Sequence, residues 1–376
     1  MFVTFDVSTN GVTSNKNESK EKEMRKSVGL VASIAFVASA LMGAPAANAA
    51  SASDIVSGGS SFAGGIIQAC ATNFAAANPT AGSVTYTKNA SQTGKDNFRL
   101  GTYDMGGTDF IYSNTNGDNL PSGAKYVAVT SGPIAIAYNL PISNLKMTPE
   151  LLAKIYKGSI TTWNHAEILA IQVNTVKTAL NRLASKTITP AYRTAGSGTS
   201  FNFSGYLKST TSNFTQSSDW SEATGDATPR GNAYSSSSNL KTGINATAGS
   251  IGYLDLKDAT GIKVALLRNQ NGQYYAADAK RSATFLNAQA DSAVKANGNV
   301  DIDWTKSVNG GYNATLITYA IVNTTGKTVS VKGATVKKFL QYTLATCGPS
   351  VSYGLGYTPI QGAIRTKAYA ILNTVK

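Results

Sequence analysis

The sequence is poor in the residues that most often carry chemistry. Among 376 residues there are one histidine, His165, and two cysteines, Cys70 and Cys347. Because a protein metal centre needs several His, Cys or carboxylate ligands close together, the sequence predicts no metal site. A serine nucleophile would depend on His165, and "TTWNHAEI" places that residue at a helix start, as a surface or capping histidine. The sequence therefore predicts that the chain is not an enzyme.

Three common functional signatures are also missing. The phosphate loop of NTPases needs Gly-x-x-x-x-Gly-Lys-Ser/Thr. "GKD" at 94–96 lacks the hydroxyl, and "GKT" at 326–328 has Ile321 in place of the first glycine. No dinucleotide fingerprint follows a predicted strand, and no Gly-x-Ser-x-Gly elbow occurs. We therefore expect no cofactor, no nucleotide binding and no acyl-transfer chemistry.

The chain has no apolar run of the length that crosses a membrane. An apolar run over 28–44 is short for about 30 Å of hydrocarbon. Arg25 and Lys26 precede this run, and a small-residue site, "ANA", follows it at 47–49. This pattern is typical of a secretory signal peptide. The alternative interpretation is a membrane anchor.

If the chain is exported, its first residues are removed and its two cysteines meet an oxidising environment. Residues 1–23 are polar and precede a second methionine, Met24, so they are an upstream extension from a misplaced start or a long n-region. We assign 1–49 to signal peptide and extension, and expect the remainder in the periplasm or secreted beyond it. In an oxidising compartment Cys70 and Cys347 form a disulfide or remain separate buried thiols, and we favour the disulfide.

Acidic residues are few, and the chain is basic. It contains 33 Lys and Arg against 20 Asp and Glu, a net charge of +13. Such a balance favours anionic partners through long-range steering. The basic residues are scattered, however, and they do not alternate with aromatic residues along a stripe. We therefore expect no nucleic-acid partner.

Predicted strands alternate with helices, which indicates an α/β protein whose sheets are covered on both faces. A helix over 147–158 is signalled by a capping threonine, a proline in the first turn and a closing glycine. The apolar stretch 126–141 predicts a pair of buried strands interrupted at Gly132 and Pro133. We expect the Ser/Thr/Asn-rich stretch 208–238 to be looped.

Three segments share one design: a strand end, a turn rich in Gly and Ser, then a helix. They are "GGSSF" at 58–62, "NASQTG" at 89–94 and "AGSGTS" at 195–200. Such turns leave backbone N–H groups unpaired at a helix start, where the helix dipole also favours an anion. Arg193 stands just ahead of the third turn. The sequence therefore predicts an anion-binding site formed by three loops.

These motifs resemble the phosphate-binding proteins that serve ABC-type phosphate importers in bacteria, over about 55–357. "GGSSF" is similar to the family's Gly-x-Gly-x-Thr-Phe turn, and "YTKNASQTG" to its Tyr-x-x-x-x-Ser-Ser-Gly segment. "MGGTD" resembles Gly-x-Ser-Asp, and "RTAGSGTSF" resembles Arg-x-Asp-Gly-Ser-Gly-Thr, the most specific motif. "ELLAKIYKGSITTWN" and "GSIGYLDL" also resemble landmarks of that family.

The resemblance implies a two-lobed α/β periplasmic-binding-protein fold of type II, with the ligand in the cleft between lobes. Lobe I comprises 54–130 and 316–376, and lobe II comprises 131–315. It also implies a monomer that binds inorganic phosphate with high affinity and passes it to the membrane permease subunits of an importer. The implied phosphate-binding residues are Ser61, Phe62, Ser91, Asp109, Arg193, Ser197, Gly198 and Thr199.

Asp109 bears on which anion is bound. A carboxylate beside an anion is tolerable where the ligand carries a proton for it to accept, which phosphate does near neutral pH and sulfate does not. Asp109 therefore favours phosphate, unless it simply caps a turn. The chain departs from the family at Ala195, where the family has a second aspartate that restrains the arginine. Two alternatives stay open: a binder of sulfate, molybdate or a phosphonate, and a secreted phosphatase-like relative.

Overall fold

Strands and helices alternate along the chain, as the sequence predicts. The computed structural model describes residues 51–376 except 116, 195 and 327, so the predicted signal segment at 1–49 and Ala195 lie outside the described residues. The strands are β1 (Ile55–Gly59), β2 (Val84–Lys88), β3 (Met105–Thr108), β4 (Ala124–Tyr138), β5 (Lys146–Met147), β6 (Thr189–Arg193), β7 (Asn232–Tyr234), β8 (Ser250–Asp255), β9 (Lys263–Val264), β10 (Leu266–Arg268), β11 (Tyr274–Tyr275) and β12 (Thr315–Asn323).

The helices are numbered in the order in which they occur along the chain. The α-helices are α1 (Gly64–Ala77), α2 (Ser91–Arg99), α3 (Pro149–Tyr156), α4 (Ala166–Ala170), α5 (Asn174–Asn181), α6 (Gly198–Thr211), α7 (Trp220–Thr224), α8 (Ser237–Ala246), α9 (Ala279–Asn287), α10 (Val331–Tyr342), α11 (Gly348–Val351) and α12 (Gly362–Leu372). Three short turns of 3-10 or π type complete the list: η1 (Asp291–Ala293), η2 (Thr343–Cys347) and η3 (Tyr353–Leu355).

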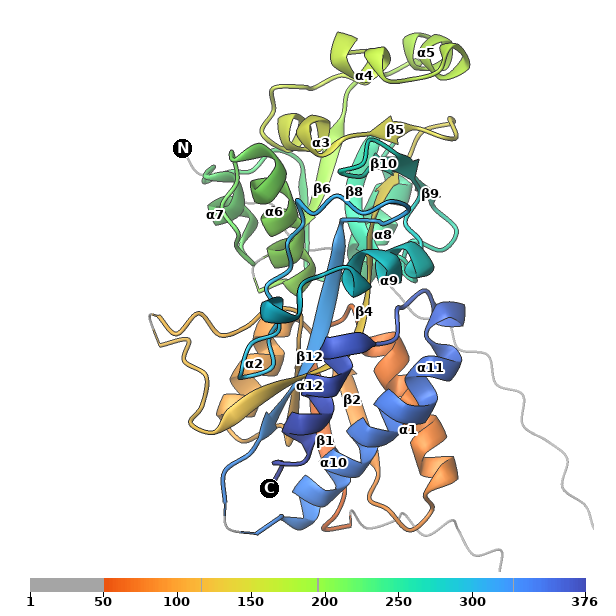
Figure 1. The fold of residues 1–376 in the computed structure, drawn as a ribbon. Coiled ribbons are helices and arrows are strands. Elements are labelled where there is room, and N and C mark those ends of the chain that lie inside the picture. Colours follow the sequence, from red (N-terminus) through yellow and green to blue (C-terminus); the bar gives the residue numbers. More distant parts are fainter. Residues whose placement is uncertain (1–50, 116, 195, 327) are drawn as a thin grey trace, which may run out of the picture. The chain divides into compact units, whose positions relative to one another are not determined.

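One mixed sheet organises the described residues. Its strand order is β2-β1-β3-β12-β4-β8-β6-β7, and β9 adds to β4. The long strands β4 and β12 lie in the middle of this order and are antiparallel to each other (Figure 1). Toward one edge β1 is parallel to β2 and β3, and toward the other edge β6 is parallel to β7 and β8. A separate small sheet has the order β11-β10-β5.

Strand β4 corrects the prediction of two strands interrupted at Gly132 and Pro133. It is one strand through both residues. Its first part pairs with β12 as far as Pro133, and its last part pairs with β8 from Ile134 onward. Proline has no N–H to donate to a ladder, and here it stands where the strand changes partners. The Gly132-Pro133 step therefore marks the point where β4 changes its pairing partner from β12 to β8, and not a break in the strand.

The stretch 208–238 was expected to be looped, and that prediction is wrong in part. Helix α6 runs to Thr211, α7 and β7 follow, and α8 begins at Ser237. Trp220 is buried and stacks on Phe203, with ring centroids 5.9 Å apart. Burial of one large ring stabilises this polar stretch against the core, which composition alone does not indicate.

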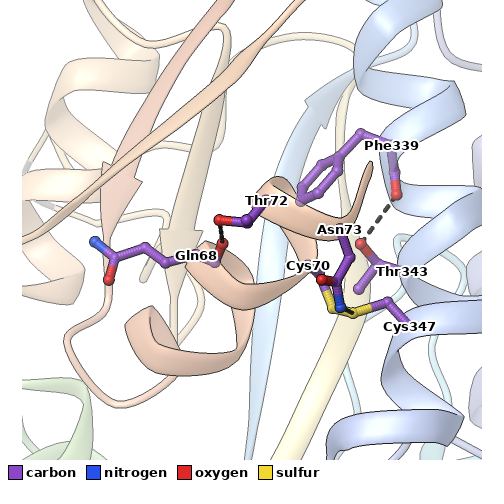
Figure 2. The surroundings of a disulfide bond; sticks show 7 residues. All are labelled: Gln68, Cys70, Thr72, Asn73, Phe339, Thr343 and Cys347. Carbon is purple, nitrogen blue, oxygen red and sulfur yellow. Dashed lines mark hydrogen bonds between the residues drawn. A yellow bond between two sulfur atoms is a disulfide. The ribbon is translucent and has the colours of Figure 1, made fainter. Parts of the chain in front are cut away.

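The predicted disulfide between Cys70 and Cys347 is confirmed. The two residues are 277 positions apart, and they join α1 to η2 (Figure 2). Both cysteines are buried. Nearby, Phe74 of α1 packs edge-on against Phe339 of α10, with ring centroids 5.6 Å apart. The bridge therefore fixes helices from the two ends of the described chain to each other.

Replacing both cysteines by serine is expected to lower the free energy of unfolding by about 2–5 kcal/mol, because the bridge closes a long loop in the unfolded chain. Urea denaturation of the oxidised wild type and of the double variant measures this difference. A reductant should destabilise the wild type and leave the double variant unchanged. Equal stability of the two oxidised proteins would contradict the prediction.

Candidate anion-binding site

Three helices begin at the turns that the sequence singled out. Helix α1 follows β1, α2 follows β2, and α6 follows β6 after a short turn. The starts of α2 and α6 touch, because the Gln92 N–H donates to the Gly196 carbonyl at 3.2 Å. A Cβ added to Gly198 would lie 2.6 Å from Oδ2 of Asp109 and would also collide with Oγ of Ser91. Glycine at 198 is thus required for this close approach.

Asp109 directly follows β3 and is 3% exposed. Its Oδ1 accepts two short hydrogen bonds, from Ser60 Oγ at 2.5 Å and from Thr318 Oγ1 at 2.6 Å. Among the residues that the structure describes, its Oδ2 accepts only a longer bond from Ser91 Oγ at 3.3 Å. Oδ1 is therefore fully used, while Oδ2 faces the start of α6 with capacity for one more donor.

Burial raises the pKa of Asp109 to about 6, although hydroxyl bonds and the nearby Arg193 act in the opposite direction. At neutral pH the side chain is still a carboxylate, and hence an acceptor. The pKa of Asp109 is higher in the folded protein than in the unfolded chain. Ionisation of Asp109 therefore lowers the free energy of unfolding as the pH rises through about 6. An added hydrogen-bond donor at Oδ2 would offset part of that cost.

Arg193 ends β6 and is 3% exposed. Its Nη1 donates to Ser237 Oγ at 3.0 Å and to Ser61 Oγ at 3.4 Å, and its Nη2 donates to the Ser235 carbonyl at 3.0 Å. Its Nε is buried and has no partner among the described residues. Burial lowers the pKa of Arg193 from its usual value, yet the guanidinium stays charged.

No carboxylate of the described chain lies within 4.0 Å of the Arg193 guanidinium, since the six ion pairs found there involve other residues. A buried cation that lacks a counterion is unfavourable. Its direct hydrogen-bond partners are neutral hydroxyls and a carbonyl, and only the more distant charges of Asp109, Asp258 and Asp255 favour the cation. The arrangement therefore suits an anion that would both neutralise the guanidinium and accept from Nε.

The remaining predicted residues lie on the same helix starts. Ser197 caps α6 by accepting from the Ser200 N–H, and Thr199 is buried in the first turn of that helix. Ser61 contacts Arg193 directly, as given above. The Phe62 ring is buried edge-on against Tyr357, and the Phe62 carbonyl accepts from the Tyr357 hydroxyl at 2.8 Å.

Sequence reasoning missed several polar residues that the fold brings into this group: Ser60, Asn202, Ser235, Ser237, Tyr253 and Thr318. Ser237 begins α8, and Ser61 and Ser237 form a hydroxyl pair at 3.2 Å. The run "SSSSN" at 235–239 carried a helix-start signal, a capping serine at Ser236 followed by Asn239, but its composition favoured a loop. Thr318 lies within β12, where no local signal marks it.

His165 lies where the sequence placed it. It caps α4, and its Nδ1 accepts the Glu167 N–H at 3.3 Å. Within residues 51–376, leaving aside the three gaps, no group of His, Cys, Asp and Glu could hold a metal ion. None of the helices in this part of the chain is long and apolar enough to cross a membrane.

Comparison with known proteins decides the family. The model of the PBP superfamily domain matches residues 44–346. The phosphate-binding protein PstS 3 of Mycobacterium tuberculosis is 30% identical over 314 residues, which cover 77% of this chain and 78% of that protein. The chain belongs to the PstS-like phosphate-binding proteins. The phosphate-binding protein PstS of Xylella fastidiosa is 28% identical over 199 residues, 52% of this chain and 46% of that protein.

Solved structures show the fold of this PstS-like chain. A high affinity periplasmic phosphate-binding protein (PfluDING), bound with phosphate at pH 8.5, aligns with a TM-score of 0.64 at 17% identity, covering 84% of this chain and 93% of that one. The phosphate-binding protein of Stenotrophomonas maltophilia aligns with a TM-score of 0.61 at 18% identity, over 84% and 93% of the two chains. The predicted α/β periplasmic-binding-protein fold is thereby confirmed.

Proposed function

We propose that this protein binds inorganic phosphate with high affinity and delivers it to an ABC-type phosphate importer. The observation that carries the proposal is that a buried Arg193, which has no ion-pair partner among the described residues, lies near an acceptor, Asp109, at the meeting point of three helix starts. The proposed ligand contacts are Ser61, Phe62, Ser91, Asp109, Arg193, Ser197, Gly198 and Thr199. Phe62 and Gly198 would contribute main-chain N–H groups, and the hydroxyl residues could add their side chains.

The chemistry of these groups favours phosphate over sulfate. Hydrogen phosphate presents acceptor oxygens to the guanidinium and the helix N–H groups, and one hydroxyl that can donate to Asp109 Oδ2. Sulfate lacks that proton at neutral pH, so it would set an oxygen against a buried carboxylate. An unsatisfied buried acceptor costs about 1–3 kcal/mol, and more when it is charged. Asp109 would therefore act as the selectivity filter.

We propose the same two lobes as the sequence analysis, with 54–130 and 316–376 in one and 131–315 in the other. In support, β4 changes its partner from β12 to β8 at Pro133, close to the proposed boundary. The ligand contacts come from both sides of that point. Closure would be a hinge motion that brings Arg193 and the start of α6 against Ser61, Ser91 and Asp109.

The family supports a proposal for the cellular setting. The relatives carry the name phosphate-binding protein, and one solved relative is described as periplasmic. We propose that the mature chain is a monomer in the periplasm, or secreted beyond it, and that it docks on the permease subunits of the importer. No catalysis is proposed, because hydrolysis of a phosphate ester requires an activated nucleophile or a metal.

A second candidate ligand is another oxyanion, and one observation favours it. Arg193 has no carboxylate partner among the described residues, so the guanidinium keeps its full charge for the ligand. A more positive site attracts divalent anions more strongly and therefore excludes them less well. Sulfate, molybdate or a phosphonate would exploit that charge, provided that Asp109 tolerates them.

Isothermal titration of the mature chain with phosphate, sulfate and methylphosphonate at pH 7.5 tests the proposal. Phosphate is expected to bind at least 100-fold more tightly than sulfate, which corresponds to about 3 kcal/mol of discrimination. The protein must first be stripped of any copurified anion by unfolding and refolding. Equal affinity for sulfate and phosphate would refute the assigned role of Asp109, and the absence of phosphate binding would refute the function.

A further inference from the structure

Two phenylalanines, Phe110 and Phe201, pack on each other across the boundary between the two proposed lobes. Phe110 directly follows Asp109, and Phe201 lies in the first turn of α6. Their rings are stacked, with centroids 5.0 Å apart and an interplanar angle of 23°. Neither ring belongs to the main hydrophobic core of the described residues. The pair therefore joins the two proposed lobes and is separate from that core.

Asn202, the next residue of α6, joins the same two segments through hydrogen bonds. It is buried, and its Nδ2 donates to the Asp109 carbonyl at 2.6 Å and to the Gly198 carbonyl at 2.9 Å. Asp109 and Gly198 are both proposed ligand contacts, one from each proposed lobe. The two N–H groups of one amide nitrogen therefore hold the start of α6 against the residue that follows β3.

Lys95 of α2 contacts Phe110 from within the same proposed lobe. The Lys95 side chain is fully buried, and its Nζ lies 4.1 Å from the centroid of the Phe110 ring. The same Nζ pairs with Asp118 at 2.8 Å and donates to the Ile111 carbonyl at 3.3 Å. A cation over an aromatic ring attracts it and favours one ring position. Phe110 is thus fixed to the helix that begins with the proposed ligand contact Ser91.

Phe201 is the more accessible of the two rings, since Phe110 is 6% exposed and Phe201 is half-buried. Both rings line a cavity of about 250 Å³, together with Asn202, Trp304 and Tyr319 among others. Rings that pack at the edge of a cavity can separate without opening the hydrophobic core. The pair is therefore placed to separate when the proposed lobes open and to stack again when they close.

We propose that Phe110, Phe201 and Asn202 form a clamp whose contacts are present in the closed, anion-bound form and absent from the open form. The inference rests on the proposed phosphate function and its two lobes, and it adds the contacts that hold the lobes together. A contact made only in the closed form shifts the equilibrium toward that form, which raises the affinity for the anion.

The clamp acts on affinity and not on the choice of anion. Its three side chains are neutral, and the contacts described above join them to one another, to two backbone carbonyls and to Lys95. The clamp therefore adds the same free energy to the closed form whichever oxyanion is bound. Phe201 and Asn202 are thus positioning residues, whereas the proposed discrimination between anions depends on the Asp109 carboxylate.

The first test is a double-mutant cycle for phosphate binding by the mature chain, with the wild type, Phe110→Ala, Phe201→Ala and the double variant. Calorimetry should give a coupling factor of about 2- to 12-fold in Kd, the range for one aromatic pair. The same cycle, measured by urea unfolding of the anion-free proteins, should give no coupling, because the open form lacks the contact.

The second test compares anions. Phe201→Ala and Asn202→Ala should each weaken phosphate and sulfate binding by the same factor, about 2- to 12-fold, and mainly through faster dissociation in stopped-flow measurements. Phe214→Ala is the matched control. It removes a buried phenylalanine that packs on Trp220 within one proposed lobe, with ring centroids 5.9 Å apart, so it should bind both anions like the wild type.

Absence of coupling in the Kd values would overturn the inference, whether or not the two rings are coupled in the unfolding of the anion-free protein. Unequal losses for phosphate and sulfate would also overturn it, because the clamp would then act on selectivity. Absence of phosphate binding by the wild type would instead refute the proposed function. Should Phe201→Ala fail to fold, Phe201→Leu takes its place in the cycle, since leucine keeps an apolar side chain without a ring to stack.

Discussion

Replacing Arg193 by alanine is expected to weaken phosphate binding by about 30- to 4,000-fold, the range for removing one partner of a buried, hydrogen-bonded charge pair. The guanidinium is buried, its Nε has no partner among the described residues, and no carboxylate there neutralises it. Its charge is therefore available to the ligand. The empty protein should keep its stability or gain some, because a buried cation without a counterion is removed.

Two further variants separate charge from geometry. Arg193→Lys keeps the positive charge but loses the planar fork, and it should fall between wild type and alanine. Arg230→Ala removes the same charge from a side chain whose Nη2 donates to the Ile188 carbonyl at 2.8 Å, and it should bind phosphate like the wild type. Calorimetry at fixed ionic strength measures all three. Arg193→Ala within threefold of the wild type would exclude Arg193 as a ligand contact.

Local signals were sufficient to predict the parts of the site that are local in sequence. The turns before α1, α2 and α6 were readable because a strand end, small polar residues and a helix start follow one another within a few positions. The export signal expected at 1–49 also predicted an oxidising compartment, and the Cys70–Cys347 bridge is compatible with that prediction. The order of residues around Arg193 sufficed to indicate the family.

Long-range contacts were not predictable in the same way. Thr318 donates to Asp109 across 209 positions, and Ser237 meets Arg193 across 44. Both residues contribute a single hydroxyl to the site. The composition around Thr318 indicates only a buried strand, and the composition around Ser237 indicates only a loop. The continuous strand β4 was missed because proline usually interrupts a sheet, and only the change of partner explains its place. Such features depend on which strands become neighbours.

Replacing Asp109 by asparagine is expected to raise sulfate affinity by about 10- to 100-fold while changing phosphate affinity by less than about tenfold. The hydroxyls of Ser60 and Thr318 both donate to Oδ1, so the asparagine oxygen should take that position. The amide nitrogen then occupies the place of Oδ2, where it becomes a donor facing the start of α6. Sulfate gains a hydrogen bond in place of a repulsive carboxylate.

Phosphate affinity changes less with this substitution. Phosphate loses the Oδ2 acceptor for its hydroxyl, but it can turn an unprotonated oxygen toward the new amide donor. Competition of sulfate against phosphate at pH 7.5 measures the change in selectivity. Asp104→Asn is the matched control: it removes a carboxylate that pairs with Lys332 at 2.9 Å ahead of β3, and it should leave selectivity unchanged. The prediction is contradicted if Asp109→Asn excludes sulfate as strictly as the wild type. The discrimination against sulfate would then have to arise from the helix starts. The role of Asp109 would be limited to its hydrogen bonds with Ser60, Ser91 and Thr318.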